Sequence, residues 1–183
     1  MFQYCPACGK KEIQFAGNKF NCPICGFIYY HNTAAATGCV IQVGDKIALI
    51  VRGREPSIGK LDLPGGFSDP GEGVFEGLHR ELKEELGWAP QIPAGVSLAD
   101  VYTLFASFSN KYPYKNIIYN TCDMFFTISA PDLNEKDFQP EAGEVAELKL
   151  LRPQDIKPED FAFDSIRKAV EAFVEYKRKN NEG

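Results

Sequence analysis

Two closely spaced pairs of cysteines near the start of the chain limit its folding more than any other feature. Each pair has two residues between its members and a glycine directly after it, and residues 9–21 separate the pairs. Such a turn aims two sulfur atoms at one point, and two turns of this kind are typical of a tetrahedral zinc site. About 30 residues cannot bury a sufficient core, so bound Zn²⁺ would supply much of the folding free energy. The expected ligands are Cys5, Cys8, Cys22 and Cys25.

The composition of the whole chain excludes several classes of protein. Its 183 residues, 44% of them apolar, suit one compact domain with a small appendage and are too apolar for a disordered chain. No run approaches the roughly 18 apolar residues that span a bilayer, and residues 1–10 lack an apolar signal core. We therefore expect a cytoplasmic protein without disulfides or membrane contact. The net charge of −5 disfavours nucleic acid as a partner.

The cysteine pairs and a hinge expected at residues 31–33 divide the chain into a zinc ribbon over residues 1–33 and a larger domain over 34–183. A hairpin is expected around the turn Ala16–Asn18, and Cys39 and Cys122 are expected to be small core residues. Strands and helices mix without the regular alternation of a doubly wound sheet, which favours an α+β, mixed-sheet αβα sandwich. The expected strands are 36–43, 46–52, 101–108, 117–128 and 144–151, with a turn over 110–116 and helices over 72–86 and 165–178. Within residues 61–67, a short strand is expected to break into a Pro-Gly-Gly turn.

The helix expected over 72–86 carries a concentrated group of carboxylates. At 100° per residue, Glu81, Glu84 and Glu85 fall within an arc of about 100°, beside an apolar arc that would face the core. Gly77 falls within the glutamate arc, where a missing side chain would clear space for a metal or a phosphate. Carboxylate clusters bind hard divalent cations, and Mg²⁺ is often completed by substrate phosphates. The alternative interpretation is a solvated acidic helix.

The residues around this helix form a longer motif that resembles an intact Nudix box. The box residues are Gly66, Glu72, Arg80, Glu81, Leu82, Glu84, Glu85, Gly87 and Trp88. The resemblance to Nudix hydrolases implies the Nudix αβα fold and hydrolysis, dependent on Mg²⁺ or Mn²⁺, of a nucleoside diphosphate linked to another group, such as NADH or ADP-ribose. It implies Glu81, Glu84 and Glu85 as catalytic metal ligands, oriented by Arg80. The alternative is a catalytically weak nucleotide sensor whose ribbon contacts nucleic acid or protein.

Members of this family usually take a further acidic ligand from outside the box. The late stretch Glu144–Leu148 resembles the one that often supplies it, and Glu144 is the preferred candidate, with Glu141 and Glu147 behind it. The alternative is surface acids at the start of a strand. A carboxylate must also accept a proton from the attacking water, and the choice between Glu81 and Glu84 stays open.

The ribbon before the box resembles the layout of NADH pyrophosphatases. Of their further S-Q-P-W-P-F-P signature, Ser109 and Pro113 are identical here, and Tyr112 and Tyr114 keep aromatic character, so the substrate within the class stays open. Resembling enzymes are often homodimers, and a small-molecule nucleotide is the expected substrate. The candidate substrate-binding residues are the stacking tyrosines Tyr112 and Tyr114, Asn110 for a base edge, Tyr30 after the ribbon, Arg52 and Arg54 for phosphate, and the turn glycines Gly65 and Gly66. The alternatives are aromatic packing in a turn for the tyrosines after the box, interdomain packing for Tyr30, and exposed arginines.

Overall fold

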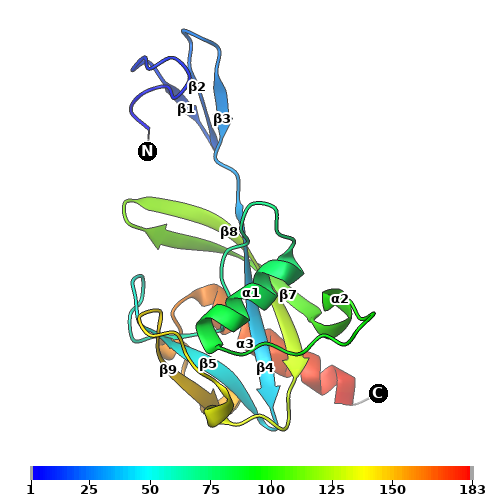
Figure 1. Cartoon of the computed structure of the whole chain (residues 1–183). Coiled ribbons are helices and arrows are strands. Elements are labelled where there is room, and N and C mark those ends of the chain that lie inside the picture. The colour runs from blue at the N-terminus through cyan, green and yellow to red at the C-terminus, as the bar shows by residue number, and fades with distance from the viewer. Residues whose placement is uncertain (1, 182–183) are drawn as a thin grey trace.

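The computed structural model describes residues 2–181 and contains two separate β-sheets. The smaller sheet is antiparallel and has the order β1-β2-β3. Its strands are β1 (Gln14–Ala16), β2 (Lys19–Asn21) and β3 (Ile28–Tyr30). The hairpin predicted from the sequence is present as β1 and β2, and β3 adds a third strand to it. Figure 1 shows this small sheet standing at one end of the molecule, joined to the larger part by an extended segment.

The larger sheet has six strands and mixed direction, as predicted. Its path is β6-β5-β4-β8-β7, with β9 paired to β5. The central pair β4 and β8 is parallel, with Ala34 opposite Thr121 and Gln42 opposite Ser129, whereas the other pairs are antiparallel. The strands are β4 (Ala34–Val43), β5 (Lys46–Arg52), β6 (Leu61–Asp62), β7 (Thr103–Tyr114), β8 (Ile117–Ser129) and β9 (Val145–Leu151).

Helices cover both faces of the larger sheet and complete an αβα sandwich (Figure 1). Neighbouring residues of a strand point to opposite faces, so Ile41 packs with α1 (Val74–Leu86) and Val40 packs with α3 (Asp164–Asn181). The three leucines of α1 at helical spacing are completely buried, and α1 ends at Gly87, whose φ of +60° suits a glycine. The remaining elements are α2 (Leu98–Val101), η1 (Glu135–Asp137), η2 (Pro153–Asp155) and η3 (Pro158–Asp160).

The β7–β8 hairpin is longer than the sequence predicted. Strand β7 continues to Tyr114, so the expected turn over 110–116 shrinks to Lys115 and Asn116, with Lys115 at a φ of +53°. The hairpin extends beyond the helices (Figure 1). This extension explains why Cys122 is exposed, contrary to the prediction of a core position: its side of β8 is no longer covered by α1. Cys39 is buried, as predicted.

None of the helices in residues 2–181 combines the length and the apolar character that crossing a membrane requires.

Candidate functional site

The four N-terminal cysteines converge on one point of the ribbon. Their sulfur atoms all lie within 4.8 Å of one another, and the pairs Cys5–Cys25 and Cys8–Cys22 are each separated by 3.7 Å. The two turns are built alike, because Gly9 donates its N–H to the carbonyl of Cys5 and Gly26 donates to that of Cys22. Tetrahedral coordination with zinc–sulfur bonds of about 2.3 Å requires sulfur atoms about 3.8 Å apart. The donor set therefore fits Zn²⁺ in both chemistry and size.

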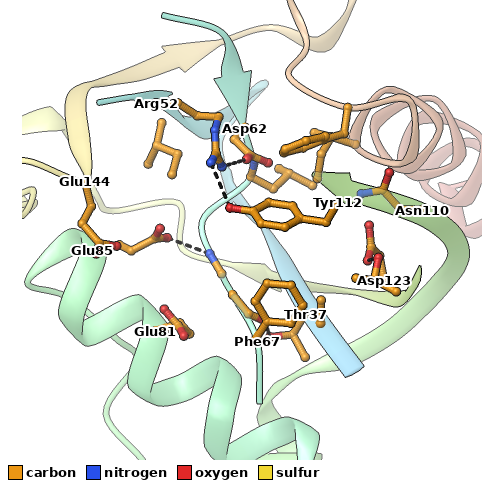
Figure 2. A pocket seen from close by; sticks show the side chains of 18 of the residues that line it. Thr37, Arg52, Asp62, Phe67, Glu81, Glu85, Asn110, Tyr112, Asp123 and Glu144 are labelled. Atoms are coloured by element: carbon orange, nitrogen blue, oxygen red, sulfur yellow. Dashed lines mark hydrogen bonds and ion pairs between the residues drawn. The ribbon is translucent and has the colours of Figure 1, made fainter. Parts of the chain in front are cut away.

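A second site is a cleft of about 210 Å³ between α1, the larger sheet and the start of α3. Figure 2 shows Glu81, Glu85 and Glu144 toward one end of this cleft. Asn110 and Asp123 lie on the other side of Tyr112 from these glutamates. The cleft thus has an acidic end, an aromatic middle and a polar far end.

Glu85 is the most deeply buried glutamate of the cleft, with 8% of its surface exposed. The backbone N–H of Gly65 donates to its Oε2 at 2.8 Å. Burial raises the pKa of Glu85 to about 8, and the negative charges of Asp62, Glu81 and Glu144 add to the shift. A carboxyl group in this position would ionise more readily beside a divalent cation, so the acidic end of the cleft fits a hard metal ion.

Arg80 binds three glutamates and the preceding loop at once. Its guanidinium donates to both oxygens of Glu72 at 2.8 and 3.0 Å, to Glu81 at 2.9 Å and to Glu84 at 2.8 Å. It also donates to the carbonyl of Phe67 at 3.2 Å. The bonds from Arg80 lower the pKa of Glu72, whereas burial raises that of Glu81. Glu84 has a side chain 52% exposed and lies outside the cleft.

Three glycines allow close contacts of the loop before α1 with its neighbours. A Cβ on Gly66 would lie 2.5 Å from Oε1 of Glu81, and one on Gly65 would lie 2.2 Å from the carbonyl oxygen of Thr37. A Cβ on Gly77 would lie 3.2 Å from Glu72 and Ser68. The missing side chain at Gly77 therefore makes room for the loop, and not for a metal or a phosphate as the sequence suggested.

The candidates from outside α1 divide into those in the cleft and those outside it. Glu144 lies in the cleft and forms an ion pair with Arg54, whose side chain is 58% exposed. Glu141 and Glu147 do not line the cleft, and Glu147 pairs with Lys149 at 3.2 Å. Of the candidates for the fourth acidic ligand, Glu144 is the one that the fold brings to the other carboxylates.

Arg52 lines the cleft but is committed to contacts within the protein. It donates to Asp62 at 2.6 Å and to the carbonyl of Pro56 at 2.6 Å, and its guanidinium lies over the ring of Phe163. Its side chain is only 12% exposed, so the alternative of an exposed arginine is wrong for Arg52, whereas Arg54, at 58%, is exposed.

The fold also places some of the residues predicted to bind the nucleotide inside the cleft and others outside it. Tyr112 stands in the cleft, with its ring 5.3 Å from that of Phe67 and 5.5 Å from that of Phe163. Tyr114 shares a face of β7 with Tyr112 but lies beyond the cleft at the exposed hairpin end. Tyr30 lies on the ribbon, half exposed, under the ammonium group of Lys19. The fold of one chain therefore brings Asn110 and Tyr112 to the cleft, and leaves Tyr30 and Tyr114 outside it.

Two buried aspartates of the cleft were missed by sequence reasoning. Asp62 lies between two buried leucines, and burial raises its pKa to about 6 although Arg52 acts in the opposite direction. Asp123 accepts hydrogen bonds from Thr121 at 2.5 Å and from Ser165 at 2.7 Å. An acidic residue directly between two apolar residues of an expected strand was the signal that could have identified both positions.

A glycine-rich loop, an arginine-braced glutamate helix and an αβα sandwich together define the Nudix class of fold. The model of the NUDIX domain matches residues 32–173. The chain therefore belongs to the NUDIX domain family, and the resemblance carried by the box is confirmed.

Curated relatives match different parts of the chain. An ADP-ribose pyrophosphatase from Methanocaldococcus jannaschii is 42% identical over 76 residues, which are 42% of this chain and 43% of that protein. A NAD-capped RNA hydrolase NudC from Deinococcus radiodurans is 25% identical over 173 residues, which cover 92% of this chain and 55% of that protein. The chain spans about half the length, or less, of the curated relatives it matches.

Solved structures share the fold. A NUDIX hydrolase from Nitrosomonas europaea superposes with a TM-score of 0.68 at 24% identity, covering 97% of this chain and 93% of that chain. The NUDIX domain of NrtR from Shewanella oneidensis, solved in complex with ADP ribose, has a TM-score of 0.62 at 19% identity and covers 80% of this chain and 90% of that chain.

Proposed function

We propose that this chain hydrolyses the pyrophosphate bond of a nucleoside diphosphate linked to another group, of the dinucleotide or nucleotide-sugar class. The observation that carries the proposal is the gathering of Glu81, Glu85 and Glu144 at one end of a cleft that is lined further along by aromatic rings. Relatives named ADP-ribose pyrophosphatase and NAD(P)H pyrophosphatase support this substrate class. The full set of box glutamates favours hydrolysis over a sensor.

The acidic end would hold Mg²⁺ or Mn²⁺ through Glu81, Glu85 and Glu144. Glu84, whose Oε2 accepts from Arg80 outside the cleft, would join these ligands after its side chain turns toward the ion. The four N-terminal cysteines form a compact group, with all their sulfur atoms within 4.8 Å of one another. Within residues 2–181, the carboxylate oxygens of the glutamates form no such compact group. Such an open arrangement leaves coordination positions for water and substrate phosphate oxygens. The ion, when bound, would supply neutralisation of phosphate charge and a lower pKa for the attacking water.

The residues of the chain would position the reaction around this ion. Arg80 would hold Glu81 and Glu84 in fixed orientations, and the N–H of Gly65 would hold Glu85. Glu81 or Glu84 would accept the proton of the attacking water. Arg54, exposed at the mouth of the cleft, would attract the diphosphate.

Zn²⁺ on the four cysteines would have a structural role, because four thiolates leave no open position for a substrate. We assign residues 1–33 to this ribbon and residues 34–183 to the hydrolase domain.

We also propose a homodimer, since Leu104 on β7 and Val174 on α3 are about half exposed despite their apolar side chains. Sedimentation equilibrium tests the dimer, and a single species at the mass of one chain would contradict it.

The function is tested by measuring hydrolysis across a substrate panel with Mg²⁺, with Mn²⁺ and with EDTA. The panel comprises NADH, NAD⁺, ADP-ribose, FAD, dinucleoside polyphosphates and nucleoside triphosphates. We expect divalent-metal-dependent release of a mononucleotide from the dinucleotides or nucleotide sugars. A preference for a triphosphate over all of these would overturn the proposed class.

A matched pair of variants on α1 links the activity to the cleft. Glu85→Gln removes the charge at the buried end and should lower kcat/KM by at least about 100-fold. Glu76→Gln makes the same change at an exposed position of the same helix and should leave activity unchanged. Full activity of Glu85→Gln with metal present would contradict the proposed site.

A further inference from the structure

The end of the cleft farthest from the glutamates holds a carboxylate to which the proposed hydrolysis assigns no role. Asp123 is 7% exposed and lines the cleft with Asn110 and Thr121. Its Oδ1 accepts from the hydroxyl of Thr121, and its Oδ2 accepts from the hydroxyl of Ser165. A carboxylate offers about four acceptor positions, so Asp123 retains capacity for a donor from a ligand.

This carboxylate lacks a cationic partner. Within residues 2–181, Asp123 forms no ion pair, and the nearby guanidinium of Arg52 is engaged by Asp62 at 2.6 Å. A buried carboxylate is costly unless hydrogen-bond donors satisfy it. A ligand that brings N–H groups to Asp123 would therefore bind better than one that brings acceptor oxygens.

Asn110 gives the same end of the cleft a complementary donor. Its Oδ1 accepts from the N–H of Lys111 at 2.8 Å, which leaves the amide NH₂ to donate. Figure 2 shows Asn110 and Asp123 on the same side of Tyr112. An acceptor and a donor placed together match the edge of a group that has an N–H donor beside an acceptor.

The shape of the cleft suits one planar ring. Phe67, Tyr112 and Phe163 line it, with the rings of Phe67 and Tyr112 at 85° to each other. Its volume of about 210 Å³ is below the roughly 300–1,000 Å³ of pockets that enclose a whole drug-sized ligand. The enclosed part can thus hold one ring-bearing end of a dinucleotide, while the rest stays at the open mouth.

We propose that Asp123 is a specificity-determining residue that selects a planar ring with an amino or carboxamide N–H donor. This inference rests on the proposed function. Two substrate groups share the required chemistry, the 6-amino edge of adenine and the carboxamide of nicotinamide. Asp123 would disfavour the corresponding groups that present a carbonyl or a carboxylate in place of the NH₂.

The test compares kcat/KM within two matched substrate pairs under one metal concentration. ADP-ribose against IDP-ribose changes the amino group of adenine to a carbonyl, and NAD⁺ against nicotinic acid adenine dinucleotide changes the carboxamide to a carboxylate. In the pair whose ring occupies the subsite, we expect the native chain to prefer the NH₂ form by at least about tenfold. The pair that responds identifies the ring.

Three variants assign that preference to Asp123. Asp123→Asn should bring the preference close to one, mainly through KM, because the charge is lost and an N–H donor is presented instead. Ser165→Ala removes one hydroxyl that orients Asp123 and should reduce the preference part of the way. Asp132→Asn makes the matched change at an exposed position and should leave it unchanged. If Asp123→Asn does not fold, judged by its Tm, Ser165→Ala carries the comparison.

The experiments distinguish failure of the specificity role of Asp123 from failure of the proposed hydrolase function. Efficient hydrolysis of both pairs without preference, or a preference that survives Asp123→Asn, would overturn the specificity role and leave the hydrolase function standing. If none of these substrates is hydrolysed, the proposed function fails. Calorimetric binding of AMP against IMP, and of nicotinamide mononucleotide against nicotinic acid mononucleotide, then decides the role of Asp123 without turnover, and equal affinities within both pairs would overturn it.

Discussion

The thiolate cluster of the ribbon and the glutamate end of the cleft are built in opposite ways. The four sulfur atoms come from two short turns and already lie within 4.8 Å of one another. The glutamates come from α1 and from the segment before β9, are braced by arginines, and stay more widely spaced. The first arrangement suits an ion that is held permanently, and the second suits an ion that is completed by water and substrate.

The two sites also differ in what stabilises the part of the fold around them. In the ribbon, which is too small to bury a sufficient core, a bound metal would take over part of the stabilising role of a core. In the cleft, the core of the sandwich is complete, and its stability allows Glu85 to be buried although burial disfavours its charged form; a bound cation would favour that form. One metal would thus stabilise a fold, and the other would be held by a fold that is already stable.

The largest expected effect comes from opening the thiolate cluster. Cys22→Ser should lower bound zinc from one equivalent per chain to nearly zero and unfold residues 5–30, because structural zinc contributes on the order of 10 kcal/mol to such segments. Zinc content and the amide NMR spectrum report the two changes. Cys122→Ser, an exposed position, is the control. A ribbon that keeps its dispersed amide signals without zinc would contradict the account.

The next largest effect is expected when a methyl group is added beside Glu81 at the acidic end of the cleft, with no change of charge. Gly66→Ala would place a methyl group 2.5 Å from Oε1 of Glu81 and should lower kcat by about 100-fold. Gly73→Ala meets Glu76 at the same 2.5 Å, but that side chain is exposed and free to move, so activity should be kept. Equal activity of the two variants would show that the position of Glu81 does not matter.

Glu85 should also make the metal-free protein less stable as the pH rises. Its pKa is about 8 in the folded protein, well above the 4.5 of an ordinary glutamate, so the folded state retains a proton that the unfolded state loses. The free energy of unfolding should therefore fall by about 1 kcal/mol per pH unit between about pH 5 and 8 and level off above that.

Urea unfolding of the native chain and of Glu85→Gln measures this slope. The difference between the two should grow in favour of the variant across that range, and Mg²⁺ should flatten the slope of the native chain. Parallel stability curves at all pH values would show that the carboxyl group of Glu85 is not buried in its neutral form.

The smallest effect concerns the ion pair of Arg54 with Glu144. Because the Arg54 side chain is 58% exposed, the pair contributes little to stability, and Arg54→Ala should shift Tm by no more than about 2 °C. It should raise KM by about threefold by removing positive charge from the mouth of the cleft. An unchanged KM at low ionic strength would exclude Arg54 from attracting the substrate.

Sequence reasoning succeeded where the information was local. The thiolate cluster follows from the C-x2-C spacing, and the arc of glutamates and the buried leucines follow from helical periodicity. It failed where strands distant in the sequence meet. Whether Tyr112 or Tyr114 reaches the cleft depends on how far β7 and β8 extend past α1, which composition does not show. Asp123 becomes part of the cleft only because β8 runs parallel to β4 and Ser165 lies beside it in the first turn of α3.

The two-metal account is tested most directly by following zinc content and hydrolysis in the same sample. The protein is treated briefly with EDTA, passed through a desalting column and supplied with Mg²⁺ alone. The account predicts that activity disappears with EDTA and returns with Mg²⁺, while one zinc per chain remains bound throughout. Activity that follows the zinc content and ignores Mg²⁺ would contradict it.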